Sequence, residues 1–163
     1  MNIKNYAGTG LVMLSLLFTA CSGSKEARTM KKTINGEWTL GTITVEGVAG
    51  KVNATVFNEA DYNCFTGSTW HFVSNNSSGT YTLPGVGPGC TAISRKIRWS
   101  IYEPAGQEKR FQFKRLDEKK NPLDDGNGYR LTVGELTETS MQLKSDISYN
   151  GRPVTVVYNF TKN

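Results

Sequence analysis

The sequence predicts an all-β domain of eight antiparallel strands, and three observations lead to this fold class. Apolar and polar side chains alternate in short runs along most of the chain after residue 34, which is the period of a half-buried strand. Clusters of Asn, Asp, Ser and Gly separate these runs and are typical of turns. Because most loops between the runs are short, consecutive strands are expected to pair into a sandwich or a closed barrel.

The first 20 residues have the zones of a secretion signal. An apolar segment from Leu11 to Phe18 follows a short start whose one charge is Lys4. This segment cannot cross about 30 Å of bilayer hydrocarbon, which needs about 20 residues, and it fits a signal-peptide core instead. We therefore assign residues 1–20 to a cleaved signal and expect the mature chain in the cell envelope.

The end of this signal, Leu17-Phe18-Thr19-Ala20-Cys21, resembles the lipobox of bacterial lipoproteins, with Phe18 where that family usually has leucine. The resemblance implies cleavage before Cys21 and attachment of acyl chains such as palmitate to this cysteine. An ordinary secretion signal with an incidental cysteine is the alternative. Two or more acyl chains anchor a protein stably, so we expect Cys21 to hold the mature protein on a membrane, namely the outer membrane.

Residues 21–33 are expected to comprise the lipidated cysteine and a flexible tether. The stretch from Ser22 to Lys32 is polar and contains no aromatic residue, and such a composition buries too little apolar surface to fold by itself. Residues 34–163 have the length of one domain, and neither an internal repeat nor a second linker divides them. We expect no amphipathic helix of useful length.

Each predicted strand corresponds to one alternating run. The eight runs are Gly36 to Val45, Ser68 to Ser74, Ser78 to Leu83, Arg95 to Tyr102, Lys109 to Leu116, Gly128 to Val133, Thr139 to Tyr149 and Arg152 to Thr161. Gly41 shifts the alternation of the first run and predicts a bulge. Asn150-Gly151 predicts a two-residue hairpin turn between the last two runs, since both positions need a positive φ.

The chain has three cysteines, so Cys64 and Cys90 remain as a pair if Cys21 carries the lipid. Export places this pair where disulfides form and persist. Two free buried thiols or half of a metal site are the alternatives, but no cluster of His or Cys residues accompanies the pair. We therefore predict a Cys64–Cys90 disulfide and no metal site.

Gly36-Glu37-Trp38 stands at the head of the first run and resembles the Gly-x-Trp signature of lipocalins. In that family the tryptophan plugs the closed end of an eight-stranded up-and-down barrel, and a basic side chain from the last strand packs over it. Lys162 is the nearest such residue here. The spacing of strands and cysteines is also similar to that of small lipocalin-like lipoproteins of Gram-negative bacteria. The resemblance implies a barrel of calycin type over residues 34–163. Because the tether enters at Ile34, next to Trp38, we expect the lipid anchor beside the closed end and the mouth facing away from the membrane.

Under this topology six inward side chains are expected to touch any small ligand in the upper part of the barrel. They are Leu83, Ile97, Trp99, Phe113, Tyr129 and Tyr149. Plain core packing is the alternative for all six, because side chains can just fill an eight-stranded barrel and ten aromatic residues point inward. An empty apolar volume of about 300 Å³ or more would favour a binder of small molecules, whereas a packed interior would favour a protein that acts through its surface.

The chemistry in the sequence favours binding over catalysis. His71 is the one histidine and lacks an evident partner with which it could activate a nucleophile. Asp124 and Asp125 lie in a glycine-rich loop and are expected to be solvated. The glycine-rich stretch from Gly85 to Gly89 precedes no helix that could present a phosphate site. We therefore expect no enzymatic activity, no catalytic residue and no cofactor.

The charge of the chain does not indicate a nucleic-acid partner. Loss of Lys4 with the signal lowers the formal net charge from +5 to +4, and alternation turns aromatic rings inward and cations outward, so they cannot form one surface for single strands. The expected partners are the membrane, through the anchor on Cys21, and a small apolar or amphipathic molecule in the barrel mouth. The alternative function is a structural or interaction protein with a filled barrel and no ligand.

Overall fold

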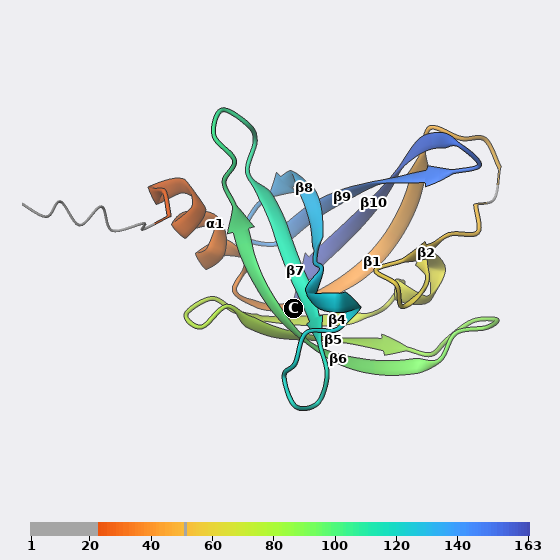
Figure 1. Cartoon of the computed structure of the whole chain (residues 1–163), viewed down its shortest axis with the longest axis horizontal. Helices are drawn as coiled ribbons and strands as arrows, with labels where there is room; N and C mark the ends of the chain where they lie inside the picture. Colours follow the sequence, from red (N-terminus) through yellow and green to blue (C-terminus); the bar gives the residue numbers. More distant parts are fainter. Residues whose placement is uncertain (1–22, 51) are drawn as a thin grey trace, which may run out of the picture.

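The computed structural model describes residues 23–50 and 52–163, so the expected signal peptide and Cys21 lie outside the described residues. Eight strands form a closed antiparallel barrel in the order β1-β10-β9-β8-β7-β6-β5-β4 (Figure 1). Consecutive barrel strands pair with one another, and β1 closes the ring by pairing with both β10 and β4. The predicted eight-stranded up-and-down barrel is confirmed.

The barrel strands agree closely with the predicted runs. They are β1 (Gly36–Glu46), β4 (Thr69–Val73), β5 (Ser78–Pro84), β6 (Ala92–Tyr102), β7 (Arg110–Leu116), β8 (Tyr129–Leu136), β9 (Ser140–Tyr149) and β10 (Arg152–Lys162). The pairing register shifts between Leu40 and Thr42, which confirms the bulge at Gly41. Asn150 and Gly151 have φ values of 51° and 75°, as the predicted hairpin turn requires.

Two loops carry short elements of their own. Between β1 and β4 lie the two-residue strands β2 (Thr55–Val56) and β3 (Ala60–Asp61) and the 3-10 helix η1 (Tyr62–Phe65). We call the segment Val52–Phe65 the lid. A second 3-10 helix, η2 (Asp124–Gly126), lies in the loop between β7 and β8.

Residues Lys25–Ile34 form helix α1, which corrects the expectation of a flexible tether for residues 25–33, whereas residues 21 and 22 lie outside the described residues. The Ser24 hydroxyl caps this helix by accepting a hydrogen bond of 3.1 Å from the backbone N–H of Ala27. Ala27 and Ile34 are buried, and the helix lies against β6 and β8. A helix this short gains most of its stability from the surface on which it packs, so the composition of the stretch did not reveal it. None of the helices in residues 23–50 and 52–163 is long and apolar enough to span a membrane.

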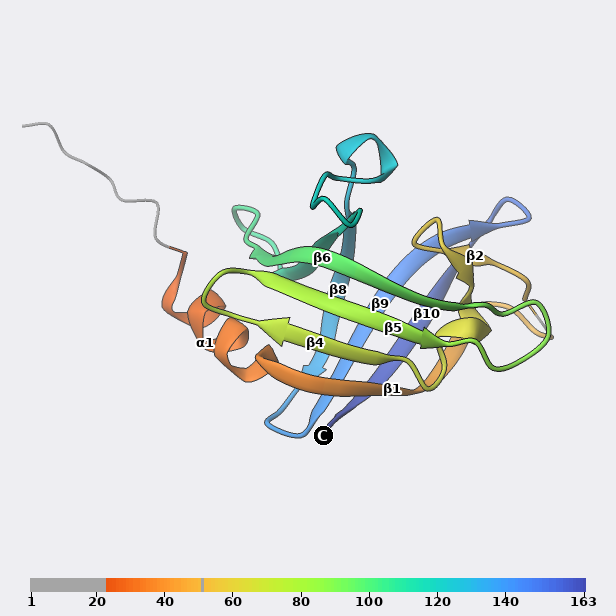
Figure 2. The ribbon, with the colours of Figure 1, turned by 90° about the horizontal axis from the view of Figure 1, so that it is seen from below.

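Helix α1 covers the end of the barrel at which β1 begins (Figure 2). There the fully buried Trp38 donates a hydrogen bond of 2.8 Å from Nε1 to the Ile34 carbonyl. Lys162 Nζ lies 5.2 Å from the centre of the Trp38 ring and donates to the Thr33 carbonyl at 2.9 Å. Gly36 has a φ of 117°, and a Cβ there would lie 3.1 Å from Lys162 Cε. Gly36, Trp38 and Lys162 therefore meet at the closed end, as expected from the sequence.

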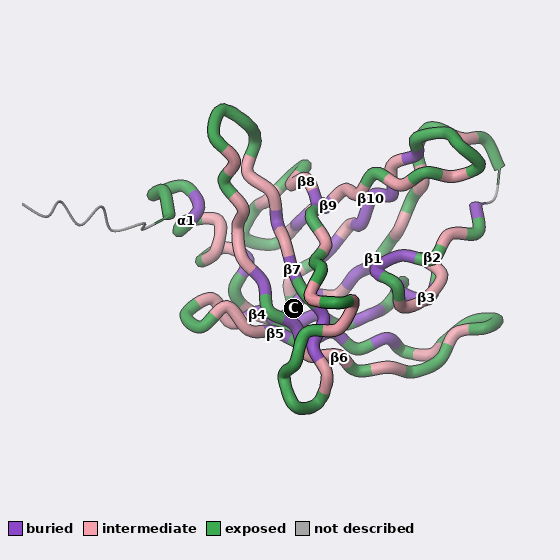
Figure 3. The backbone as a smooth tube through the Cα atoms, in the orientation of Figure 1, coloured by how far each residue is buried: buried purple, intermediate pink, exposed green. Residues whose placement is uncertain are grey.

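Aromatic side chains fill the barrel interior. Buried residues alternate with more exposed ones along β4 and β5 (Figure 3). Because side chains alternate between the two faces of a strand, every second one points inward. Trp70 stacks on Tyr81 with ring centres 4.7 Å apart and meets the edge of Phe113 at 5.8 Å. The void among the central rings is about 10 Å³, roughly the smallest volume that can hold one water molecule. The interior is therefore packed.

We predict that Trp38→Ala lowers the free energy of unfolding by about 3–5 kcal/mol, as other truncations of large core residues do. The reason is that Trp38 fills the closed end beneath α1 and Lys162. Val86 is 75% exposed, so the control Val86→Ala should change stability by less than about 0.5 kcal/mol. Chemical denaturation of both variants measures the difference, and a loss below about 1 kcal/mol for Trp38→Ala would contradict its role as a plug.

Candidate functional site

The lid folds into the barrel mouth, the end of the barrel opposite α1 (Figure 1). Its residues Val52, Val56 and Phe65 are buried and belong to the core. Phe57, at the tip between β2 and β3, reaches furthest. Its ring centre lies 5.1 Å from that of Phe113, 5.3 Å from that of Tyr129 and 5.4 Å from that of Tyr158. The chain's own lid thus occupies the place in which a ligand was expected.

The tip of the lid has an unusual backbone. Phe57 and Asn58 have φ values of 54° and 46°, a left-handed conformation that is uncommon for a large side chain. The neighbouring contacts compensate for this strain, because the Phe57 ring packs in the mouth and Asn58 Nδ2 donates to Asp124 Oδ1 at 3.4 Å. Strained residues that are held in this way mark positions that the surrounding structure specifies closely.

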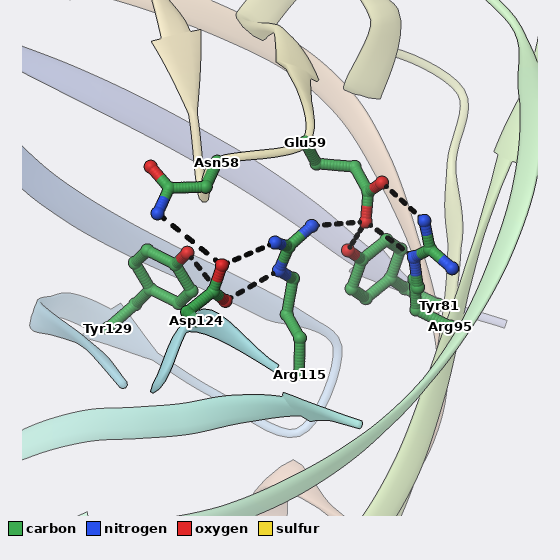
Figure 4. Close-up of polar contacts among 7 residues, drawn as sticks. All are labelled: Asn58, Glu59, Tyr81, Arg95, Arg115, Asp124 and Tyr129. Atoms are coloured by element: carbon green, nitrogen blue, oxygen red, sulfur yellow. Dashed lines mark hydrogen bonds and ion pairs between the residues drawn. The ribbon is translucent and has the colours of Figure 1, made fainter. Parts of the chain in front are cut away.

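Glu59 is the third residue of the tip, and its carboxylate is buried among donors from three strands, β5, β6 and β7 (Figure 4). Its side chain is 4% exposed. The carboxylate accepts hydrogen bonds from Arg95 Nε at 2.8 Å, from Arg115 Nη1 at 2.7 Å and from the Tyr81 hydroxyl at 2.6 Å. Arg95 Nη2 adds a second bond to Glu59 at 2.9 Å. Three side chains of the barrel therefore hold the tip of the lid.

Asp124 extends these contacts to the β7–β8 loop. Arg115 donates to Asp124 from Nη2 at 2.6 Å and from Nε at 2.9 Å, which makes a bidentate pair. The Tyr129 hydroxyl donates to Asp124 Oδ2 at 2.9 Å. We call these residues the mouth network: Asn58, Glu59, Tyr81, Arg95, Arg115, Asp124 and Tyr129 (Figure 4).

The mouth network is charged but balanced at neutral pH. Burial would raise the pKa of Glu59, but hydrogen bonds from Arg95, Tyr81 and Arg115 outweigh it and hold the pKa at about 2. The hydrogen bond from Arg115 lowers the pKa of Asp124. Burial, helped by the hydrogen bond to Asp124, raises the pKa of Tyr129 to about 12. Two carboxylates thus face two guanidinium groups, and none of these shifts brings a group near neutral pH, where general acid–base catalysis works best. These paired charges hold the lid tip and the β7–β8 loop against the barrel mouth.

The structure brings together two of the six residues proposed as ligand contacts. Phe113 and Tyr129 lie at the mouth with ring centres 5.3 Å apart. Leu83 and Ile97 are fully buried in the core, and Tyr149 is half-buried against it near the end of β9. The void among the central rings is about 10 Å³ and has Phe113 in its wall, and ligand binding at the mouth stays a prediction.

The expectation that Trp99 lies in the upper part of the barrel was wrong. Its ring centre is 5.4 Å from that of Phe72 and 5.8 Å from that of Phe111. Lys31 of α1 places its Nζ 5.5 Å from the centre of the same ring. The reason is that β6 runs from the mouth toward α1, and Trp99 lies near the end of this strand. Its indole therefore packs beneath the helix.

Sequence reasoning missed the charged residues of the mouth network, although alternation contained part of the signal. Arg95 precedes Ile97 by two positions and Arg115 follows Phe113 by two, so both lie on inward faces. Asp124 was expected to be solvated, but its side chain is 10% exposed because Arg115 and Tyr129 enclose it. Glu59 lies in the lid, where apolar and polar residues do not alternate in a way that would indicate burial.

The predicted Cys64–Cys90 disulfide is confirmed, with the two Cα atoms 5.3 Å apart. It joins η1 of the lid to the loop between β5 and β6. The bond fixes the base of the lid, whereas Glu59 and Phe57 hold its tip.

We predict that Glu59→Gln destabilises the protein by about 1–3 kcal/mol at pH 7, because it removes hydrogen bonds to charged partners. The pKa of Glu59 is about 2 in the folded protein against an ordinary value of 4.5. Its contribution is therefore fully present above about pH 4.5 and is lost as the pH falls toward 2. The stability difference between wild type and variant should shrink over that interval.

Denaturation curves between pH 7 and pH 2 test this prediction. The control is Glu118→Gln, which removes a carboxylate that is 86% exposed and paired with Lys96, so its effect should stay below about 1 kcal/mol. Parallel pH curves for wild type and Glu59→Gln would show that the Glu59 carboxylate does not lock the lid.

No protein-family model, curated protein or solved structure gives a significant match to this chain. Its function is therefore inferred from its own residues and contacts.

Proposed function

We propose that this protein is a lipid-anchored, lipocalin-like lipoprotein of the cell envelope that binds partners through its outer surface. The packed barrel carries the proposal. The interior holds a void of about 10 Å³, and Phe57 of the lid fills the mouth. A binder of small molecules needs a cavity of about 300 Å³ or more. A barrel that is filled in this way serves as a rigid frame for its loops and outer face.

The position of α1 supports an anchor beside the closed end. The Ser24 backbone N–H donates to Glu103 at 3.0 Å, and Glu26 pairs with Lys109 at 2.6 Å. The described chain therefore begins on the barrel wall at the closed end. Acyl chains on Cys21 would hold that end toward the outer membrane, so that the lid and the mouth loops face away from it.

We predict that Cys21→Ser prevents lipidation, so that the protein is either released in soluble form or left as an uncleaved precursor. The serine cannot carry the acyl chains on a thioether that hold a lipoprotein on the membrane. Fractionation of cells, with the size of the chain read on a gel, measures the result. A serine variant of mature length that stays with the membrane would contradict lipidation.

A second function is favoured by the composition of the lid tip, which presents an aromatic ring next to a carboxylate. An amphipathic molecule with an apolar body and an acidic head would have the same pattern. With the lid displaced, its body would replace Phe57 beside Phe113 and Tyr129, and its head would replace Glu59 between the two arginines of the mouth network. Under this alternative the protein is a carrier whose lid occupies the empty site.

Native mass spectrometry of protein purified from its own membrane separates these two functions. A filled barrel predicts no bound small molecule and no binding of a dansylated C11 fatty acid. If the protein is a carrier, we expect about one bound molecule per chain. Arg95→Ala should then lower the affinity for the fatty acid by about tenfold, or about 1.4 kcal/mol. Arg152→Ala, at an exposed position, is the matched control. Stoichiometric binding with this pattern would overturn the filled-barrel proposal.

A further inference from the structure

An open groove of about 820 Å³ crosses the outer face of β6, β7 and β8. Ser100 and Gln112 are half-buried in its floor, and residues 126–128 of the β7–β8 loop form one end. Trp99, Phe113 and Tyr129, whose rings pack in or against the core, also line the groove between its outward side chains. The loop between β6 and β7 and the loop between β7 and β8 both rise above β6 in the view of Figure 2.

Three exposed cations line the groove: Arg98, Lys114 and Arg130. Within residues 23–50 and 52–163, no ion pair involves any of the three. Arg98 and Lys114 lie directly opposite each other in the β6–β7 register, and like charges in that position destabilise a sheet. An anion bound between them would remove this repulsion.

The guanidinium group of Arg130 is held in place before any ligand arrives. Its central carbon lies 4.1 Å from the centre of the Tyr102 ring. Arg130 Nε donates to Gln112 Oε1 at 3.2 Å, and Gln112 Nε2 donates to Ser100 at 2.8 Å. These contacts use one edge of the guanidinium. A planar guanidinium fixed in this way presents its other N–H groups to a carboxylate, sulfate or phosphate.

At one end of the groove, the β7–β8 loop packs directly against β7. A Cβ on Gly128 would lie 2.9 Å from the Phe113 carbonyl oxygen and 3.0 Å from Lys114 Cγ. Only a glycine lets the loop pass so near to β7, and this passage places the exposed Asn127 beside Lys114. The loop therefore adds amide and backbone groups to the same surface.

The exposed side chains that line the groove distinguish between classes of partner. Protein interfaces depend on buried aromatic and aliphatic anchors, but the one large hydrophobic residue that is well exposed in the described chain is Val86. It lies in the β5–β6 loop and not in the groove. Hydroxyl and amide groups in the floor match the hydroxyl groups of a sugar, and the three cations match its acidic substituents.

We propose that this groove binds a linear anionic saccharide that carries carboxylate or sulfate groups. Arg98, Lys114 and Arg130 contact its acidic groups, and Ser100, Gln112 and Asn127 contact its hydroxyl groups. The inference rests on the proposed function, because it names the ligand class of the outer surface.

Calorimetric titration of the whole mature protein tests this site with three hexasaccharides: oligogalacturonate with carboxylates, a heparin fragment with sulfates, and neutral maltohexaose. At least one anionic sugar should bind, with an affinity that falls as salt screens the charges, and the neutral sugar should not bind. The better of the two anionic sugars identifies the acidic group. Equal binding of all three, or of none, would overturn the proposal.

The variant Arg98→Gln, Lys114→Gln, Arg130→Gln should lose at least tenfold in affinity. Its matched control is Lys32→Gln, Lys119→Gln, Arg152→Gln, which removes the same three charges at exposed positions outside the groove and should bind as the wild type does. An equal loss in both variants would show attraction to net charge alone and would overturn the site. If the triple groove variant fails to fold, Arg98→Gln, Lys114→Gln keeps the Arg130 stack and should still lose several-fold.

Two further outcomes separate this inference from the proposed function. A small molecule found in the barrel, together with saccharide binding that depends on the groove cations, would overturn the filled-barrel proposal and support the saccharide site in the groove. Tighter binding of duplex DNA or of an acidic peptide than of either anionic sugar would overturn the saccharide proposal without contradicting the filled-barrel proposal.

Discussion

The closure of the sheet through β1 is the constraint on which the rest of the structure depends. β1 pairs with β10 along one edge and with β4 along the other, so no strand of the ring is left with a free edge over its paired length. Closure directs every second side chain into an enclosed interior, and aromatic rings fill this space. It also leaves two ends, and each needs its own cover. Trp38 and α1 cover one end with apolar surface, and the lid covers the other with a mixture of rings and charges.

The two covers differ in the kind of energy that holds them. At the closed end, burial of Trp38 and Ile34 is non-directional and follows the apolar area removed from water. At the mouth, removing Glu59 and Arg115 from water is costly, and the cost is offset only when each group finds its partners. Such a network adds less to stability than its short distances suggest. It does specify one position for the lid tip, because any other position would leave buried charges unpaired.

A filled interior moves recognition to the outside of the barrel. Alternation leaves Arg98, Lys114 and Arg130 exposed, while their neighbours in sequence, Trp99, Phe113 and Tyr129, pack in or against the core. The same period of two that builds the core therefore also arranges the cations of the groove. The core fixes the spacing of the strands, and the strands fix the distances between the charges that a ligand would meet.

Local patterns in the sequence determined the strands, the bulge at Gly41, the turn at Asn150-Gly151 and the pairing of Cys64 with Cys90. Each depends on the conformational preference of a few neighbouring residues, or on counting cysteines in an exported chain. The resemblance of Gly36-Glu37-Trp38 added the barrel topology and the closed end. The order of the strands then followed from short loops.

Only the tertiary structure decided which charges are buried. Glu59 bonds to Arg95 and to Arg115, which are 36 and 56 positions away in the chain. Whether a carboxylate in a loop faces water or a guanidinium depends on where distant segments pack, and no local pattern records that. Helix α1 has the same origin, because its ten residues become stable only against the barrel wall. The sequence by itself determined the barrel, and packing decided how its ends are closed.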